Sequence, residues 1–244
     1  LGDFYVNDAF GASHRDHASV SGIARCLPSA AGRLLEAEVR AFARVLETPE
    51  RPFVAILGGA KVSDKLLVVD NLLERVDCLL VGGAMAYTFL AAEHHRIGNS
   101  LCETEQIETC KRALAKAKAR NIELCLPVDH VVAERFSPDA PASECGLDIP
   151  DGHMGLDIGK ATRALYAARI RAARTVVWNG PMGVFEMERF RAGTEAVGRA
   201  LAECRGVTVV GGGDSVAAIH LLGLAAKVTH VSTGGGASLE LLEG

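Results

Sequence analysis

The sequence lacks the features that would place the protein in a membrane or on a nucleic acid. It has no apolar run of membrane-spanning length, and its opening residues do not form a signal peptide. Aromatic residues make up 5% of the chain, which leaves few side chains for stacking on bases. The formal net charge of -4 gives no electrostatic reason to expect nucleic acid or an anionic membrane as a partner. We therefore expect a soluble, cytoplasmic protein.

Close cysteine pairs are also missing. The chain has seven cysteines but no C-x-x-C motif, so the sequence shows no zinc-binding or dithiol redox pattern. Cys78 and Cys125 fall inside expected strands, in apolar surroundings. Scattered cysteines of this kind are typical of free thiols in a reducing compartment. The sequence therefore predicts neither disulfides nor a zinc site.

The common nucleotide-binding fingerprints are absent as well. No G-x-x-x-x-G-K-[ST] occurs, and no G-x-G-x-x-G lies between a strand and a helix. His14-Arg15-Asp16 imitates the catalytic-loop triplet of protein kinases, but Ser21 stands where that motif requires Asn and no D-F-G follows. A protein kinase is therefore excluded, and any nucleotide site must be built in another way.

What the sequence does contain is a repeated pattern of apolar strand, glycine turn and helix. Hydrophobic residues make up 49% of the chain, enough for a full core. The expected strands are Phe53–Leu57, Cys78–Val81, Ile122–Leu126, Thr175–Trp178, Val207–Val210 and Lys227–Val231. Strands that alternate with helices predict an α/β fold, a parallel Rossmann-like three-layer sheet with helices on both faces. Residues 134–157 are rich in Ser, Pro, Asp and Gly and predict loop or irregular β structure.

The stretch Val207–Ser215 is the strongest sign of a ligand site. A β-favouring run enters a Gly-Gly-Gly turn, and Asp214 and Ser215 follow at the start of an apolar helix. Glycines allow a ligand to approach the backbone, and a helix start offers free N–H groups to an anion. A carboxylate beside bound anions is suited to a divalent metal ion, although Asp214 is also suited to be a simple N-cap. Every glycine cluster follows a strand, so we expect the clusters to line one rim of the sheet.

Three further charged residues belong to this expected rim. Lys61 and Lys65 lie four residues apart at a helix start, where cations oppose the helix dipole, so a structural role is disfavoured. Together with backbone amides they would neutralise a polyphosphate, while the alternative is a solvated lysine pair. Glu186, just beyond a turn, is either a ligand for ribose hydroxyls or an exposed acid.

Ahead of the repeated pattern, Ala30–Thr48 is the clearest helix. Leu35, Val39, Phe42 and Leu46 recur at three- and four-residue steps and share one face, and Pro49 ends the helix. We expect this apolar stripe to pack on the body, and the helix is also placed to act as a hinge.

Taken together and in order, these motifs resemble the phosphoglycerate kinase family. The matching segments are Tyr5–Gly11 with His14-Arg15, Leu57–Lys65, Val81–Ala86, Met154–Gly159, Trp178–Glu186, Gly211–Ser215 and Ser232–Ser238. The resemblance covers the whole chain. It departs at Ala84, where a third glycine is common, and at His130, where an apolar residue is expected.

The resemblance implies a fragment of a two-domain kinase. Residues 1–29 would be the tail of an N-terminal substrate-binding domain, 30–48 the hinge helix and 49–244 the C-terminal nucleotide-binding domain. The implied reaction is reversible phosphoryl transfer from 1,3-bisphosphoglycerate to ADP, giving 3-phosphoglycerate and ATP with Mg²⁺, in a monomer. The fragment itself would bind Mg-nucleotide with little turnover.

The resemblance also assigns site residues. Arg15 would contact the acyl phosphate, Lys61 would follow the transferred phosphoryl group, and Asp214 would hold Mg²⁺. Lys65 and the turn residues Gly212, Gly213 and Ser215 would bind nucleotide phosphates, Glu186 would bind ribose, and Gly212 and Gly235 would belong to the catalytic set. The remaining nucleotide-binding positions would be Gly82, Gly83, Gly155, Leu156, Asn179 and Pro181.

Two other functions stay open at this point. A nicotinamide-dependent dehydrogenase would need G-x-G-x-x-G and an acid closing the next strand, and magnesium-dependent ADP binding would distinguish a kinase from it. A nucleotide-binding module without turnover is the non-enzymatic alternative.

Overall fold

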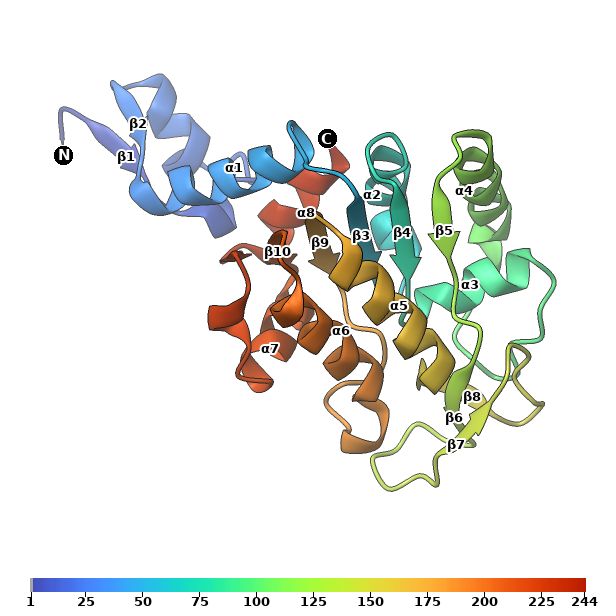
Figure 1. Cartoon of the computed structure of the whole chain (residues 1–244). Coiled ribbons are helices and arrows are strands. Elements are labelled where there is room, and N and C mark those ends of the chain that lie inside the picture. The colour runs from blue at the N-terminus through green and yellow to red at the C-terminus, as the bar shows by residue number, and fades with distance from the viewer. Residues whose placement is uncertain (1) are drawn as a thin grey trace.

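The computed structural model describes residues 2–244, and Leu1, the first residue of the expected domain tail, lies outside the described residues. Its centre is a six-stranded sheet with the order β11-β10-β9-β3-β4-β5, in which every neighbouring pair is parallel. The strands are β3 (Phe53–Leu57), β4 (Cys78–Val81), β5 (Glu123–Cys125), β9 (Thr175–Asn179), β10 (Val207–Gly211) and β11 (His230–Val231). The expected α/β class with a parallel sheet is confirmed (Figure 1).

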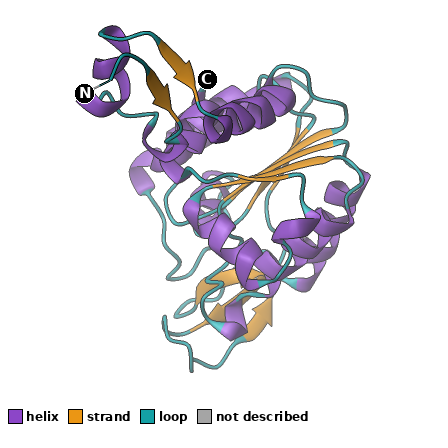
Figure 2. Ribbon diagram, turned by 90° about the vertical axis from the view of Figure 1, so that its left-hand side faces the viewer, coloured by secondary structure: helices purple, strands orange, loops and turns teal. Residues whose placement is uncertain are grey.

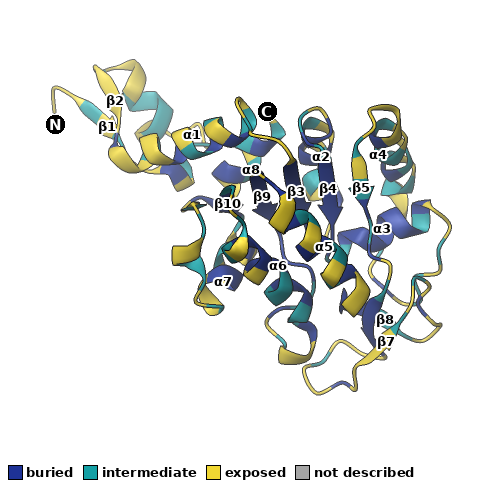
Figure 3. Ribbon diagram, in the orientation of Figure 1, coloured by how far each residue is buried: buried dark blue, intermediate teal, exposed yellow. Residues whose placement is uncertain are grey.

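The central strands are apolar on both faces because helices cover both faces. All five residues of β3 are buried (Figure 3). Phe53, Ala55 and Leu57 join one core cluster, while Val54 and Ile56 join the other, as the period of two in a strand requires. The sheet therefore separates two hydrophobic layers.

The helices divide between these two layers, and Figure 2 shows the sheet edge-on between them. Five helices contribute to the first cluster: α1 (Arg33–Leu46), α2 (Leu66–Leu72), α3 (Met85–Ala92), α4 (Ile107–Ala119) and α8 (Gly235–Glu243). The second cluster is covered by α5 (Lys160–Ala172), α6 (Ala192–Glu203) and α7 (Gly213–Leu221). No helix between residues 2 and 244 combines the length and the apolar character needed to cross a bilayer.

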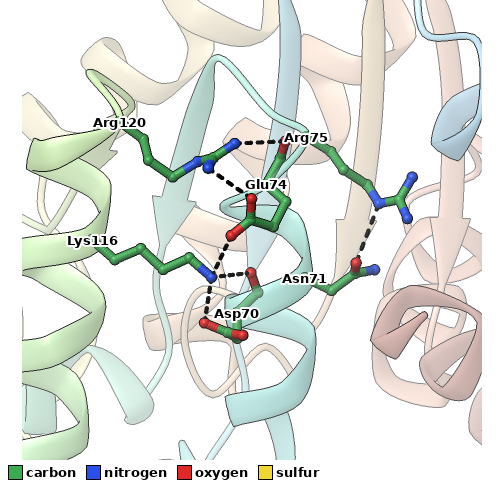
Figure 4. A network of polar contacts seen from close by, with 6 residues as sticks. All are labelled: Asp70, Asn71, Glu74, Arg75, Lys116 and Arg120. Atoms are coloured by element: carbon green, nitrogen blue, oxygen red, sulfur yellow. Dashed lines mark hydrogen bonds and ion pairs between the residues drawn. The ribbon is translucent and has the colours of Figure 1, made fainter.

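Neighbouring helices on the first face are also joined by charge. Lys116 of α4 lies 2.6 Å from Asp70 of α2 and 2.7 Å from Glu74 just beyond it. Arg120 completes the network, with a guanidinium nitrogen 2.8 Å from the Glu74 carboxylate (Figure 4). Because most of these groups are exposed, the network links α2 to α4 but adds little to the stability of the fold.

The segment expected to be loop or irregular β structure contains most of a second sheet, so the second of these alternatives is confirmed. β6 (His130–Ala133) pairs antiparallel with β7 (Ser143–Cys145) and with β8 (Met154–Ile158) in a three-stranded sheet. The composition of these strands does not indicate a regular sheet, because β7 is polar and mostly exposed, and β8 includes a glycine and an aspartate. A register shift at Val131/Val132 interrupts the pairing of β6 with β8. This sheet lies beyond the carboxyl end of β5 and forms one wall of the site described below.

The N-terminal segment pairs with itself before it reaches the body. β1 (Tyr5–Asn7) and β2 (Ser29–Ala31) form a parallel pair, and short turns including a π-helix at Ala18–Gly22 connect them. The helix predicted from Ala30 therefore begins at Arg33. The Asp8 carboxylate accepts hydrogen bonds from the N–H groups of Leu34 and Leu35 at 2.7 and 3.0 Å and so stabilises the start of α1. The proposed division at residues 29 and 48 stays a prediction.

The predicted stripe is confirmed at Leu35, Phe42 and Leu46, which pack against the first core cluster, but not at the fourth position. Phe42 is buried as expected, but Val39 is 48% exposed and Glu38 is fully buried in its place. The Glu38 carboxylate lies 2.8 Å from His230 Nε2, and accepts hydrogen bonds from the Thr233 N–H and hydroxyl at 2.6 and 2.7 Å. Burial works to raise the pKa of Glu38, but these hydrogen bonds hold it below its usual value. A polar anchor, not an apolar one, ties α1 to the turn after β11.

We predict that Glu38→Ala lowers the free energy of unfolding by about 3 kcal/mol, because it leaves His230 and Thr233 without their buried acceptor. Urea unfolding at pH 7 measures this loss. Val39→Ala, one residue along the same helix but exposed, is the matched control and should change the value by less than about 0.5 kcal/mol. Equal effects of the two substitutions would show that the anchor contributes nothing specific.

Candidate functional site

Glycine turns follow the carboxyl ends of five strands and gather at one edge of the parallel sheet. They are Gly58-Gly59 after β3, Gly82-Gly83 after β4, Gly180 after β9, Gly212-Gly213 after β10 and Gly234–Gly236 after β11. All five turns line at least one of two adjoining cavities. The turns after β3, β9, β10 and β11 line the first cavity, and the turn after β4 lines the second through Gly83. The single rim expected from the sequence is therefore present.

The first, glycine-rich cavity has a volume of about 390 Å³. Its walls come from the turns after β3, β9, β10 and β11 together with Lys61 and Lys65. The second, apolar cavity has a volume of about 470 Å³ and is lined by Tyr87, Leu156, Met182 and Val184, among others, with Glu186 also on its wall. Gly59, Ala60 and Asp214 line both cavities, so the two are halves of one site.

Close backbone contact between two turns shapes the floor of the glycine-rich cavity. Gly180 has a φ of 106°, and a Cβ at this position would lie 2.1 Å from the Gly58 carbonyl oxygen. The Gly58 N–H donates to the Asn179 carbonyl at 3.0 Å, and the Gly59 N–H donates to the Pro181 carbonyl at 3.1 Å. Only glycine fits such an approach, so the turns after β3 and β9 hold each other in place.

Two helix N-termini meet at the same cavity. α7 begins at Gly213 and α8 begins at Gly235, and a Cβ on Gly235 would lie 3.3 Å from the Gly213 nitrogen. Each helix start carries unpaired N–H groups and the positive end of a dipole. Their convergence makes the glycine-rich cavity suited to an anion by backbone chemistry alone.

Asp214 lies in the first turn of α7, between the two cavities. The N-cap is Gly212, with a φ of 84° and no side-chain capping bond, so Asp214 is not the cap. Its carboxylate is exposed and accepts no hydrogen bond from the residues that the structure describes, 2–244. Carboxylate oxygens in this position are suited to a hard divalent cation such as Mg²⁺.

Both predicted lysines line the glycine-rich cavity. The Lys65 ammonium donates a hydrogen bond to the Asn179 side-chain carbonyl. Burial lowers the pKa of Lys65, and the neighbouring Asp214 carboxylate opposes that shift. Lys61 is exposed at the mouth of the cavity. The arrangement places two cationic groups beside the paired helix starts, where a phosphate chain would need them.

A carboxylate absent from the sequence-based predictions holds the loop that carries these lysines. Glu103 accepts hydrogen bonds from the Val62 N–H at 2.6 Å, the Ser63 N–H at 3.0 Å and the Ser63 hydroxyl at 2.6 Å. Despite partial desolvation, these hydrogen bonds hold the pKa of Glu103 below its usual value. Glu103 is 40 residues away from Ser63 in the chain, so no local pattern could indicate the contact.

The apolar cavity is backed by an aromatic pair. Tyr87 of α3 packs against Gly155 of β8 so closely that a Cβ there would lie 2.1 Å from the tyrosine hydroxyl. The ring of His130, the residue for which the sequence offered no role, lies behind Tyr87 with 5.5 Å between ring centroids. His130 Nε2 lies 3.2 Å from the Leu147 carbonyl oxygen, and burial lowers the pKa of the ring. In this structure His130 therefore supports the wall of the cavity from behind.

Most of the predicted site residues meet at these two cavities. The glycine-rich cavity receives Lys61, Lys65, Asn179, Gly212, Gly213, Asp214, Ser215 and Gly235, and the apolar cavity receives Gly83, Gly155, Leu156, Pro181 and Glu186 together with Asp214. Ser215 is engaged within the protein, since its buried hydroxyl accepts the Gly180 N–H at 2.5 Å. Two predicted residues line neither cavity: Gly82 is buried against Met182, and Arg15 is exposed in the N-terminal segment.

Comparison with known proteins gives this site its context. A sequence model of the family described as "Phosphoglycerate kinase" matches residues 1–244, the whole chain. The chain belongs to the phosphoglycerate kinase family. Phosphoglycerate kinases from Herpetosiphon aurantiacus and Moorella thermoacetica are 55% and 56% identical to it over 245 residues. The alignment takes in all of this chain but 62% of each relative, so the chain spans less than two thirds of their length.

A solved member of the phosphoglycerate kinase family has the same fold. The structure of the enzyme from Coxiella burnetii superposes with a TM-score of 0.96 at 45% sequence identity. The match covers 99% of this chain and 63% of that one. The resemblance inferred from the motifs is therefore confirmed.

Asp157 of β8, directly after the cavity residue Leu156, makes the stability of the fold depend on pH. Burial raises its pKa to about 7, although its carboxylate accepts N–H groups of Gly193 at 2.7 Å and Ile158 at 2.9 Å. The pKa in the unfolded chain is about 3.9, so the folded state binds the extra proton. Stability from this group is complete below the unfolded value and is lost as the pH rises through about 7.

We predict that Asp157→Asn removes this fall of the unfolding free energy with rising pH. Relative to the variant, the wild-type chain should lose on the order of 4 kcal/mol of unfolding free energy between pH 4 and pH 8. Urea unfolding at several pH values measures the difference, and Asp151→Asn, at an exposed position outside both cavities, is the control. Parallel pH profiles for the wild type and Asp157→Asn would contradict the assignment.

Proposed function

We propose that the complete protein to which this chain belongs transfers a phosphoryl group reversibly from 1,3-bisphosphoglycerate to ADP, giving 3-phosphoglycerate and ATP. The observation that carries this proposal is the convergence of two helix N-termini, two lysines and one free carboxylate on one cavity. The lysines are Lys61 and Lys65, and the carboxylate is that of Asp214, which caps no helix. Family membership supports it. Phosphoryl transfer needs positioning and charge neutralisation, and it needs no covalent intermediate on the protein.

The two cavities divide the nucleotide between them in this proposal. The adenine lies in the apolar cavity against Gly83, Gly155 and Leu156, with Gly82 behind it and Glu186 at the ribose. The phosphates extend past Pro181 and Asn179 into the glycine-rich cavity, where Gly212, Gly213 and the backbone N–H of Ser215 hold their oxygens, since the Ser215 hydroxyl already accepts the Gly180 N–H. Support comes from the lining of the two cavities, which is apolar in one and built from glycines and lysines in the other.

The metal and the transferred group belong at the junction. Mg²⁺, held by Asp214, would neutralise phosphate charge where the two cavities meet. Lys65 would bind the nucleotide phosphates, and Lys61 would accompany the moving phosphoryl group. Gly212 and Gly235, at the starts of α7 and α8, would belong to the set that stabilises its charge. Arg15, which lines neither cavity, would reach the acyl phosphate only when the segment before α1 approaches the rim.

The domain organisation follows from the same proposal. Residues 1–29 are the end of a substrate-binding domain, 30–48 the segment with the hinge helix α1, and 49–244 the nucleotide-binding domain. The protein acts as a cytoplasmic monomer on small-molecule substrates. Closure of the two domains would exclude water from the transfer step.

The Asp214 carboxylate provides the sharpest test of the nucleotide site. Asp214→Asn should weaken ADP binding by tenfold or more, roughly the loss of one charged metal ligand, but only when Mg²⁺ is present. Isothermal titration with and without Mg²⁺ measures this, and circular dichroism checks that the fold is intact. Asp151→Asn should bind Mg-ADP like the wild type. Unchanged affinity for the Asp214 variant would show that this carboxylate holds no metal.

Turnover separates the kinase from the other functions. The complete protein should show phosphoglycerate-dependent ATP turnover in a coupled assay, while the 244-residue chain should be slower by about 100-fold or more, because lost positioning costs at least that much. Titrations with ADP and with NADH should show magnesium-dependent binding of ADP alone. Binding of NADH would favour a dehydrogenase, and an inactive complete protein that binds Mg-ADP would favour a binding module.

A further inference from the structure

Two thiols and a carboxylate meet on the sheet, away from the nucleotide site. Cys78 of β4 and Glu123 of β5 are direct partners in the parallel register. Cys125 follows Glu123 by two residues, so its side chain lies on the same face of the sheet. The two sulfur atoms and a carboxylate oxygen all lie within 4.8 Å of one another. None of the three residues lines the glycine-rich or the apolar cavity.

These three donor atoms favour one class of metal ion over others. Two cysteine sulfurs and one carboxylate oxygen suit a borderline-soft ion with tetrahedral geometry, and they do not suit Mg²⁺ or Ca²⁺. We propose that Cys78, Glu123 and Cys125 form a binding site for Zn²⁺ or a similar thiophilic divalent ion, with solvent as the fourth ligand. Among residues 2–244 no other group of three such side chains is as close.

The location gives an ion access and compensates its charge. The cysteines are 4% and 8% exposed, while Glu123 is exposed on β5, the edge strand of the sheet. Arg169 of α5 holds the carboxylate, with its Nε 2.9 Å from one oxygen and its Nη2 2.6 Å from the other. As each metal–sulfur bond forms, one thiol proton leaves to solvent. The charges at the site then sum to zero, because the guanidinium and the dication balance the two thiolates and the carboxylate.

Other roles for this thiol pair fit the geometry less well. A disulfide needs Cα atoms closer than roughly 7 Å, whereas Cys78 and Cys125 are diagonal neighbours on adjacent strands, a placement that separates Cα atoms by roughly 7–8 Å. The Cys125 thiol and burial raise the pKa of Cys78 well above its usual range, so without a metal it is not a nucleophile. A metal ion bridges a gap of this size without backbone movement.

Binding should stabilise the sheet edge. Tyr166 of α5 donates its hydroxyl to the carbonyls of Val81, at the end of β4, and Cys125 at 2.6 and 2.9 Å. An ion that joins β4 to β5 therefore adds to a link that α5 already makes. Since an ion that binds only the folded state stabilises it by mass action, Zn²⁺ should raise Tm and leave the affinity for Mg-ADP unchanged.

Cadmium titration of the full chain tests the proposal. Cd²⁺ should bind with one-to-one stoichiometry and give an ultraviolet thiolate-to-metal charge-transfer band, which Zn²⁺ should remove by competition. The double variant Cys78→Ser/Cys125→Ser should lose the band. Cys26→Ser/Cys204→Ser, which removes two thiols outside the site, should keep it. No cadmium-dependent band in the wild type, or an unchanged band in the Cys78/Cys125 variant, would overturn the proposal.

A second variant keeps the test decisive if the buried serines prevent folding. Glu123→Gln retains both thiols at an exposed position, and should keep the band while raising the Kd for Cd²⁺ by at least roughly tenfold. Glu105→Gln, an exposed carboxylate remote from the thiols, is its matched control and should leave the Kd unchanged. Equal Kd values for Glu123→Gln and the wild type would show that the carboxylate is not a ligand and would overturn the site as proposed.

Discussion

The meeting of the α7 and α8 N-termini at the carboxyl edge of the sheet is the constraint on which the rest of the site depends. Parallel strands that are buried on both faces must all leave the sheet at the same edge. Each then turns sharply into a helix, so free N–H groups accumulate there. In this chain the turns pack backbone against backbone, with Gly235 against Gly213 and Gly180 against Gly58. A side chain at Gly180 would clash with the Gly58 backbone, and one at Gly235 would press on the start of α7.

The sequence was sufficient to predict this part of the molecule because the signals are local. Apolar runs mark β3, β4, β9 and β10, and a glycine turn follows each of them. The rule that parallel strands end at one edge then places Lys61, Lys65 and Asp214 together without any knowledge of their contacts. The prediction holds because topology, rather than side-chain packing, sets the position of these groups.

What the sequence could not predict depends on contacts between distant residues. Helical periodicity selects Val39 for the buried face of α1, but the tertiary partners of that face are His230 and Thr233, which require the carboxylate of Glu38. The β6–β8 sheet is hard to predict because pairing stabilises β7 and β8, whose residues include strand formers of poor intrinsic preference. Cysteine spacing indicates no metal site, and only the register of β4 with β5 places Cys78 beside Glu123.

The carboxylate of Asp214 is exposed and has no hydrogen-bond donor among residues 2–244, yet its position in the fold is favourable. A carboxylate in the first helical turn is stabilised by the helix dipole, and the Lys65 ammonium adds a favourable charge nearby. No donor among residues 2–244 occupies its oxygens, which stay available at the junction of the two cavities. Because Gly59 and Ala60 also line both cavities, a shift of the turn after β3 would alter the glycine-rich and the apolar cavity together. Glu103, which holds the next residues of that loop, therefore influences both halves of the site from outside it.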